Sequence, residues 1–166
     1  MSFVSFWSDA LATILGGLAL AVIIFFVREK VFAPKNVTGR WYFEIVTRSS
    51  VYQPFLGMRL CYIAVLCRDA NRLFGTAEKI FESSSTGDRH YVGSSRTRSL
   101  VEGYVQHNYF GPDRIYLHIV ESGLARESTN FQDLEFHRNG QMSGLFCSMV
   151  ADQDGEARWQ RRPLPM

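Results

Sequence analysis

Hydrophobic residues follow two patterns along this chain, and the first is an unbroken apolar run from Ala10 to Val27. The run reads ALATILGGLALAVIIFFV, and Thr13 is its only polar side chain. A helix that crosses a bilayer needs about 20 mainly apolar residues, with a lower limit of about 17. Aromatic residues just before the run can extend it into the membrane interface; they are Phe3, Phe6 and Trp7. The pattern therefore predicts a transmembrane helix.

Two alternatives compete with this interpretation of the run. A secretory signal peptide has a basic start and a small-residue cleavage site. Residues 1–9 contain no Lys or Arg, and residues 28–35 offer no clear cleavage site. A buried core helix is the second alternative, and the unbroken apolar run argues against it. Arg28, Lys30 and Lys35 follow the run, so the positive-inside rule predicts a single-pass protein with a cytoplasmic C-terminal domain.

From Asn36 onward the second pattern takes over: short alternating segments are separated by turn residues. Asn139-Gly140 is a strong hairpin signal, and Pro112-Asp113 has the chemistry of a turn. Residues 83–98 are rich in Ser, Thr, Gly and Arg and predict a loop. The expected strands are Thr38–Thr47, Arg59–Arg68, Arg72–Glu82, Ser99–Phe110, Arg114–Glu121, Phe131–His137, Gln141–Val150 and Glu156–Arg162.

About eight short strands without an intervening helix predict an antiparallel barrel or sandwich. Gly39-Arg40-Trp41 opens the first strand and resembles the G-x-W start of lipocalin-like barrels, in which the Trp closes one end. Trp159 and Arg161 on the last strand can close the same end by packing and by cation–π contact. The prediction is a mainly β protein: a transmembrane anchor and basic linker over residues 1–35, then an antiparallel eight-stranded lipocalin-like barrel over residues 36–166.

Composition and charge exclude only a few classes of function. The net charge of +2 gives no broad nucleic-acid-binding footprint. Cys61, Cys67 and Cys147 have no C-x-x-C spacing, so they are expected to be small buried side chains in a reducing compartment. Cys61 and Cys67 share strand parity and should face the same side.

The histidines provide the few candidates for chemistry, since none of the common catalytic motifs occurs in the sequence. A four-residue turn over Gly111–Arg114 would pair His107 with His118 and Tyr109 with Tyr116. This face would form either the wall of a ligand pocket or an exposed surface. A metal site would lack a third ligand, and a hydrolytic or isomerising enzyme using the two histidines is a less favoured alternative.

Arginine far outnumbers lysine after residue 36, and its fork of donors suits phosphate oxygens. Arg96 and Arg98 lie in the expected loop and could form a lid over an anionic ligand. No catalytic residue, metal or cofactor is expected. The expected ligand-binding residues are Arg59, Arg98, His107, Tyr109, Tyr116, His118, Trp159 and Arg161.

An N-terminal membrane segment, a basic linker, Thr38-Gly39-Arg40-Trp41 and a compact β-domain together resemble the membrane β-barrel effectors of CBASS anti-phage defence. That SMODS-associated family is described as having two membrane helices and a β-strand-rich domain. The resemblance implies a cytosolic barrel that binds a cyclic dinucleotide made by a partner nucleotidyltransferase, followed by oligomerisation and disruption of the inner membrane. This chain departs from the family in having one membrane run.

The anchor contains small residues at the four-residue spacing that lets membrane helices approach closely. Ala12 is paired in this way with Gly16, and Gly17 with Ala21. The expectation is therefore a membrane-anchored, ligand-driven homo-oligomer that senses a cyclic oligonucleotide and is not an enzyme. The alternative is a membrane-tethered lipocalin-like binder of an apolar small molecule.

Overall fold

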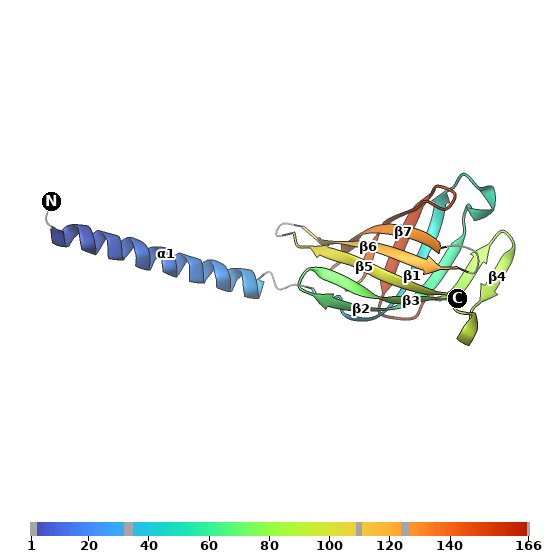
Figure 1. The fold of residues 1–166 in the computed structure, drawn as a ribbon, viewed down its shortest axis with the longest axis horizontal. Coiled ribbons are helices and arrows are strands. Elements are labelled where there is room, and N and C mark those ends of the chain that lie inside the picture. Colours follow the sequence, from blue (N-terminus) through green and yellow to red (C-terminus); the bar gives the residue numbers. More distant parts are fainter. Residues whose placement is uncertain (1–2, 32–34, 109–110, 124–126, 166) are drawn as a thin grey trace. The chain divides into compact units, whose positions relative to one another are not determined.

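The computed structural model describes residues 3–31, 35–108, 111–123 and 127–165 (Figure 1). The chain divides into two compact units, Met1–Lys35 and Asn36–Met166. The first unit contains one helix, α1 (Phe3–Val31). Within it, Trp7–Val27 is long and apolar enough to cross a membrane, and none of this segment is buried. An apolar helix satisfies its own backbone hydrogen bonds, so lipid is a suitable environment for these exposed side chains.

The small residues that were expected to mediate helix packing all lie within the apolar part of α1. Ala12, Gly16, Gly17 and Ala21 are exposed. A Cβ added to Gly16 or to Gly17 would meet no atom within 4 Å outside the neighbouring backbone of the helix. The four positions are therefore open to a second helix, and the packing of helices through Ala12, Gly16, Gly17 and Ala21 stays a prediction.

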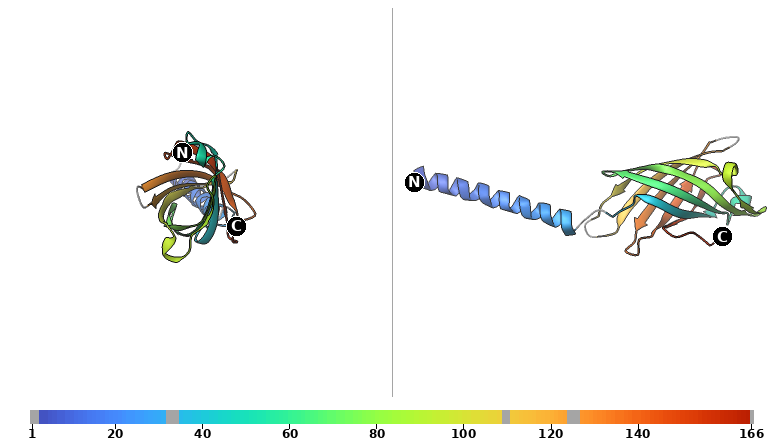
Figure 2. Two further views of the ribbon diagram at one scale, coloured as in Figure 1. Left: turned by 90° about the vertical axis from the view of Figure 1, so that its right-hand side faces the viewer. Right: turned by 90° about the horizontal axis from the view of Figure 1, so that it is seen from below.

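The second unit is a closed antiparallel barrel (Figure 2). Among the described residues, eight strands form the ring in the order β2-β1-β9-β8-β7-β6-β5-β3, and pairing of β2 with β3 closes it. The predicted fold, an apolar helix followed by an eight-stranded antiparallel barrel, is confirmed. The ring strands are β1 (Gly39–Ser49), β2 (Arg59–Asp69), β3 (Arg72–Ser84), β5 (Arg98–Gln106), β6 (Asp113–Ser122), β7 (Glu127–Phe136), β8 (Met142–Ser148) and β9 (Gln153–Gln160).

The segment expected to be a loop contains a short additional strand. β4 (Gly87–His90) pairs with the end of β3, and the 3-10 turn η2 (Gly93–Ser95) follows it. Gly87 has a φ of 108°, which a glycine adopts without strain and which allows the tight turn between Ser84 and β4. All four residues of β4 are exposed, so this strand has no hydrophobic alternation by which the sequence could reveal it. A second 3-10 turn, η1 (Gln53–Phe55), lies between β1 and β2.

Aromatic side chains fill the barrel interior as a stacked column. The Phe43 ring stacks on Trp159 with centroids 4.0 Å apart and on Tyr62 with centroids 4.6 Å apart. Trp41 meets Trp159 edge-on at 6.4 Å. All four rings are buried. Large aromatic surfaces of this kind dominate core stability, and here they occupy the space in which a lipocalin-like carrier would hold its ligand.

Arg161 closes the end of the barrel at which β1 begins. Its guanidinium carbon lies 3.8 Å from the centre of the Trp41 ring. The same guanidinium donates hydrogen bonds to the backbone oxygens of Arg40 and Asn36, each at 3.0 Å. Partial burial lowers the pKa of Arg161 from its ordinary value. The predicted closure by Trp159 packing and an Arg161 cation–π contact is confirmed.

The other end of the column terminates in a buried polar cluster. The Tyr62 hydroxyl donates to Glu121 at 2.9 Å, and the Lys79 ammonium lies 2.8 Å from the other oxygen of the same carboxylate. Glu82 accepts a hydrogen bond from Tyr91 at 3.0 Å. Burial, and then the negative charge of Glu121, raise the pKa of Tyr62 well above its usual value. Pairing of each charge offsets the cost of removing it from water.

The cysteines differ from the prediction in their burial. Cys61 is fully buried because Leu164, in the C-terminal segment, and Phe81 cover it on the outer side of β2. This burial raises the pKa of Cys61 to about 11. Cys67 and Cys147 are exposed, so the expectation of three buried cysteines is wrong. Cys61 and Cys67 do share parity on β2; the C-terminal segment covers only one of them.

Candidate ligand-binding groove on the outer wall

Strand alternation places a row of aromatic side chains on the outer wall of the barrel. On β5, Val101 and Val105 face the core, so Glu102 and Tyr104 point outward. On β6, Leu117 is buried in the same way, and its neighbours Tyr116 and His118 face outward. Aromatic residues that gather on the solvent side of a sheet can mark a contact surface.

The register between β5 and β6 corrects the predicted pairing of this hairpin. Tyr104 is opposite Tyr116, and Glu102 is opposite His118. The expected pairing of His107 with His118 is therefore wrong. Tyr109, the expected partner of Tyr116, lies outside the described residues.

The burial of the strands accounts for the observed register. A shift by an odd number of residues would move the apolar set of one strand out of the core. The observed register instead pairs Val101 with Ile119 and Val105 with Ile115, and all four side chains are buried. The hairpin connection is consequently longer than a four-residue turn.

Asn108 and Asp113 hold the two ends of this longer connection together. The Asn108 backbone N–H donates to the Asp113 carboxylate at 3.2 Å. The Asn108 side-chain amide donates to the Pro112 carbonyl oxygen at 2.9 Å. Side chains of these types often take the place of a regular backbone turn.

The outward rings form a ladder along one side of an open groove. Tyr104 and Tyr116 stack with centroids 4.8 Å apart and planes 28° from parallel. Phe131 continues the ladder, with its centroid 6.2 Å from that of Tyr116 and an interplanar angle of 25°. The groove has a volume of about 490 Å³. Its lining residues come from β2, β3, β5, β6 and β7: Asp69, Arg72, Leu73, Phe74, Glu102, Gly103, Tyr104, Tyr116, His118 and Phe131.

Polar side chains in the groove are not engaged elsewhere. Arg72, Glu102 and His118 make no hydrogen bond or ion pair with the part of the chain that the structure describes. Arg72 is opposite Tyr104 across the β3–β5 pair, and Glu102 lies between Phe74 and His118 in register. The groove therefore combines flat apolar faces with one guanidinium, one imidazole and carboxylates that are available to a ligand.

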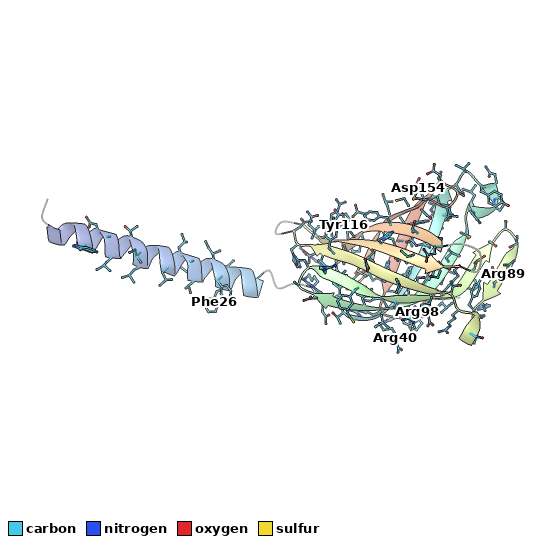
Figure 3. All side chains as sticks on the ribbon, viewed as in Figure 1. Phe26, Arg40, Arg89, Arg98, Tyr116 and Asp154 are labelled. Atoms are coloured by element: carbon cyan, nitrogen blue, oxygen red, sulfur yellow. The ribbon has the colours of Figure 1, made fainter. Side chains whose placement is uncertain are left out.

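The structure brings two of the predicted ligand-binding residues together in this groove, Tyr116 and His118. Of the others, Arg98 begins β5, where it is opposite Glu78; Tyr116 and Arg98 are labelled on separate parts of the barrel wall in Figure 3. His107 lies past the end of β5 with its Nε2 2.9 Å from Arg68, and its Nδ1 is 3.3 Å from Asp113.

The remaining predicted residues have structural partners. Arg59 donates to Glu44 at 2.7 Å and to the Pro165 carbonyl at 2.9 Å. The hydrogen bond to Glu44 is the main reason that the pKa of Arg59 is raised. Trp159 is buried and donates from Nε1 to Gln132 at 2.8 Å. Arg161 is held on Trp41, as described above.

Sequence reasoning missed the other eight lining residues of the groove, among them Arg72, Phe74, Glu102, Tyr104 and Phe131. A signal was present for three of them. Phe74, Tyr104 and Phe131 have the parity opposite to the buried positions of their own strands. Arg72 and Glu102 have no such signal, because charged residues on an outward face are ordinary.

A comparison of this chain with protein-family models, with curated proteins and with solved structures finds no match. Among the described residues, no group of three or more His, Cys, Asp or Glu side chains is placed to hold a metal ion. The functional inference therefore depends on the groove and on the apolar helix.

Proposed function

We propose that this chain is a membrane-anchored receptor whose barrel binds a cyclic oligonucleotide in the outer groove. The observation that carries the proposal is the ladder of near-parallel rings formed by Tyr104, Tyr116 and Phe131. Stacking on aromatic side chains is a common means of holding single nucleobases, and it contributes about 1–3 kcal/mol per base.

A base can enter the ladder between two of its rings only if those rings move apart. Aromatic carbons pack about 3.5 Å apart, so an inserted base needs about 7 Å between the flanking ring planes. Tyr116 and Phe131 have centroids 6.2 Å apart, and Phe131 is 43% exposed. Because Phe131 is exposed, we expect its ring to move away from Tyr116 when a base enters.

The charges of the groove suggest where the phosphates lie. Arg72 can bind a phosphate through two parallel hydrogen bonds, but the carboxylates of Asp69 and Glu102 line the same groove. These carboxylates would repel a phosphate that lay among them. We therefore place the base on the rings, with stacking as the main source of affinity. The phosphate lies against the Arg72 guanidinium, whose attraction must outweigh the repulsion from Asp69, the register partner of Arg72 on β2.

Ligand binding would act on the membrane through assembly of the chain. A ligand shifts an association equilibrium only when it binds the assembled state more tightly. The groove is open, so a bound ligand would present new surface to a second copy. Ligand-driven association of α1 in a bacterial inner membrane, with the barrel in the cytoplasm and a nucleotidyltransferase as the source of ligand, completes the proposed anti-phage role.

The barrel interior supports the carrier alternative less well. An apolar ligand would have to displace the stacked rings of Phe43, Tyr62 and Trp159, which lie 4.0 to 4.6 Å apart. An enzyme that uses His107 and His118 together also loses its geometric basis, because the two residues are not register partners.

Calorimetry on the full-length protein in lipid nanodiscs tests the proposal. We expect cyclic dinucleotides to bind and fatty acids to give no heat. Arg72→Ala should weaken nucleotide binding about 10-fold or more, the scale of a lost charged hydrogen bond. Arg98→Ala is the matched control, since this exposed arginine lies outside the groove, and it should bind like wild type. Binding of fatty acids alone would contradict the proposal.

A further inference from the structure

Glu102 is placed to read the edge of a base that the neighbouring rings hold. Its side chain lines the groove, and its register partners are Phe74 on β3 and His118 on β6. Tyr104, two residues along the same strand, faces the same side. Among the described residues the Glu102 carboxylate therefore has no ion-pair partner. Its neighbours on the outer wall, Phe74, Tyr104 and His118, all carry rings.

An ionised carboxylate only accepts hydrogen bonds. It will therefore favour a ligand edge that presents two donors side by side. Guanine does this with its N1–H and its 2-amino group, which match the two carboxylate oxygens. Adenine presents one donor beside an acceptor nitrogen, and uracil presents one donor between two carbonyl oxygens. A carboxylate oxygen facing either acceptor is repelled.

His118 complements the same arrangement. An imidazole ring can donate from a ring N–H, and His118 is opposite Glu102 across β5 and β6. On guanine, the O6 acceptor is adjacent to N1–H. The His118 donor beside the Glu102 carboxylate therefore matches the guanine edge, on which the O6 acceptor is followed by the N1–H and 2-amino donors.

We infer that the groove selects guanine among the bases of a cyclic oligonucleotide, with Glu102 as the residue that determines this specificity. The inference rests on the proposed function, because it assigns a base to the same groove. If the groove bound only phosphate, the Glu102 carboxylate would be unfavourable. As the group that recognises guanine, it contributes to binding instead.

The test compares the dissociation constants of cyclic di-GMP, cyclic di-AMP and cyclic di-UMP for the full-length protein in nanodiscs. We expect cyclic di-GMP to bind at least 10-fold more tightly than the other two. Glu102→Gln, which keeps the size of the side chain, should weaken cyclic di-GMP at least 10-fold, since the lost interaction is a charged hydrogen bond. It should not weaken cyclic di-AMP, because the neutral amide no longer repels the acceptor nitrogen of adenine.

Asp154→Asn is the matched control, an exposed carboxylate on the outer wall of β9 that lies outside the groove (Figure 3). It should preserve the guanine preference. Equal affinities for the three nucleotides, or an unchanged preference in Glu102→Gln, would overturn the inference while Tyr116-dependent binding still supported the proposed function. The absence of binding by any of the three would overturn both.

Discussion

The buried thiol of a single residue, Cys61, leads to a prediction of how the free energy of unfolding depends on pH. Burial raises its pKa to about 11, whereas a solvated thiol titrates near about 8.5. The unfolded chain therefore loses this proton first, so stability contributed by the neutral thiol is complete below about pH 8.5 and declines as the pH rises toward 11. Each unit of pKa difference corresponds to about 1.4 kcal/mol.

Cys61→Ala should consequently show a shallower loss of unfolding free energy than wild type over this alkaline range. Chemical denaturation at a series of pH values measures the slopes. Cys147→Ala is the control, because this thiol is exposed, and its slope should match that of wild type. Identical slopes for Cys61→Ala and wild type would show that burial of the thiol does not perturb its titration.

The Tyr62 hydroxyl is expected to stabilise the fold, in contrast to the hydroxyl of a groove tyrosine. Tyr62→Phe removes the 2.9 Å hydrogen bond to buried Glu121, and leaving that carboxylate short of a donor should cost about 1–3 kcal/mol. Tyr104→Phe should change stability by less than about 0.5 kcal/mol, as is usual for surface positions. Urea unfolding measures both, and equal effects would contradict the assigned roles.

At the scale of single elements, Gly103 holds β5 close to β6. A Cβ at this position would overlap the backbone oxygen of Tyr116. Gly103→Ala should therefore force the strands apart and destabilise the barrel by about 1–3 kcal/mol, the usual cost of overpacking. Because the same strands carry Tyr104 and Tyr116, ligand affinity should fall as well.

Gly111→Ala provides the comparison for this prediction. A Cβ on Gly111 meets no atom within 4 Å, so thermal unfolding of this variant should resemble wild type. A stable Gly103→Ala barrel with unchanged ligand binding would show that the close approach of β5 and β6 is not required.

The ring strands were predictable from the sequence because one face of each is buried, which imposes alternation. β6 is an example, with Ile115, Leu117 and Ile119 all inside the core. β4 could not be predicted, since its side chains are all exposed. The register was harder still to predict, because the β5–β6 connection is held by hydrogen bonds from Asn108 to Asp113 and to Pro112, and no local sequence pattern indicates them.

The groove was only partly predictable for a related reason. Tyr116 and His118 were identified as candidates, but their neighbours Tyr104 and Phe131 come from other strands. Which outward residues meet depends on the pairing of several strands. The closure at Trp41 was predictable because G-x-W and Arg161 lie at the start of the first strand and just after the last, and these two strands pair in the barrel.

For the whole molecule, variants of the anchor helix test whether ligand binding is coupled to oligomerisation. The pair of Ala12 and Gly16 and the pair of Gly17 and Ala21 lie on different faces of α1, because adjacent residues differ by about 100° around a helix. Gly17→Leu introduces a bulky side chain into open space. It should therefore leave α1 and ligand affinity intact while it reduces ligand-dependent crosslinked oligomers, because close packing through Gly17 and Ala21 is then blocked.

Val22→Leu serves as the control for that variant, since it changes one exposed apolar residue of α1 for another. Its oligomers should form as in wild type. Ala21→Leu, on the face that carries Gly17, should reduce crosslinking as Gly17→Leu does. Unchanged crosslinking in Gly17→Leu, Ala21→Leu and a matching Gly16→Leu would mean that neither small-residue face brings the helices together.

Calorimetry of cyclic di-GMP binding to full-length wild type, Tyr116→Ala and Tyr116→Phe shows directly whether the outer wall of the barrel is the binding site. Tyr116 is the middle ring of the ladder, 4.8 Å from Tyr104 and 6.2 Å from Phe131. Loss of the ring should weaken binding by about 1–3 kcal/mol, while Tyr116→Phe, which keeps it, should bind like wild type. Wild-type affinity in Tyr116→Ala would contradict a binding site on the outer wall.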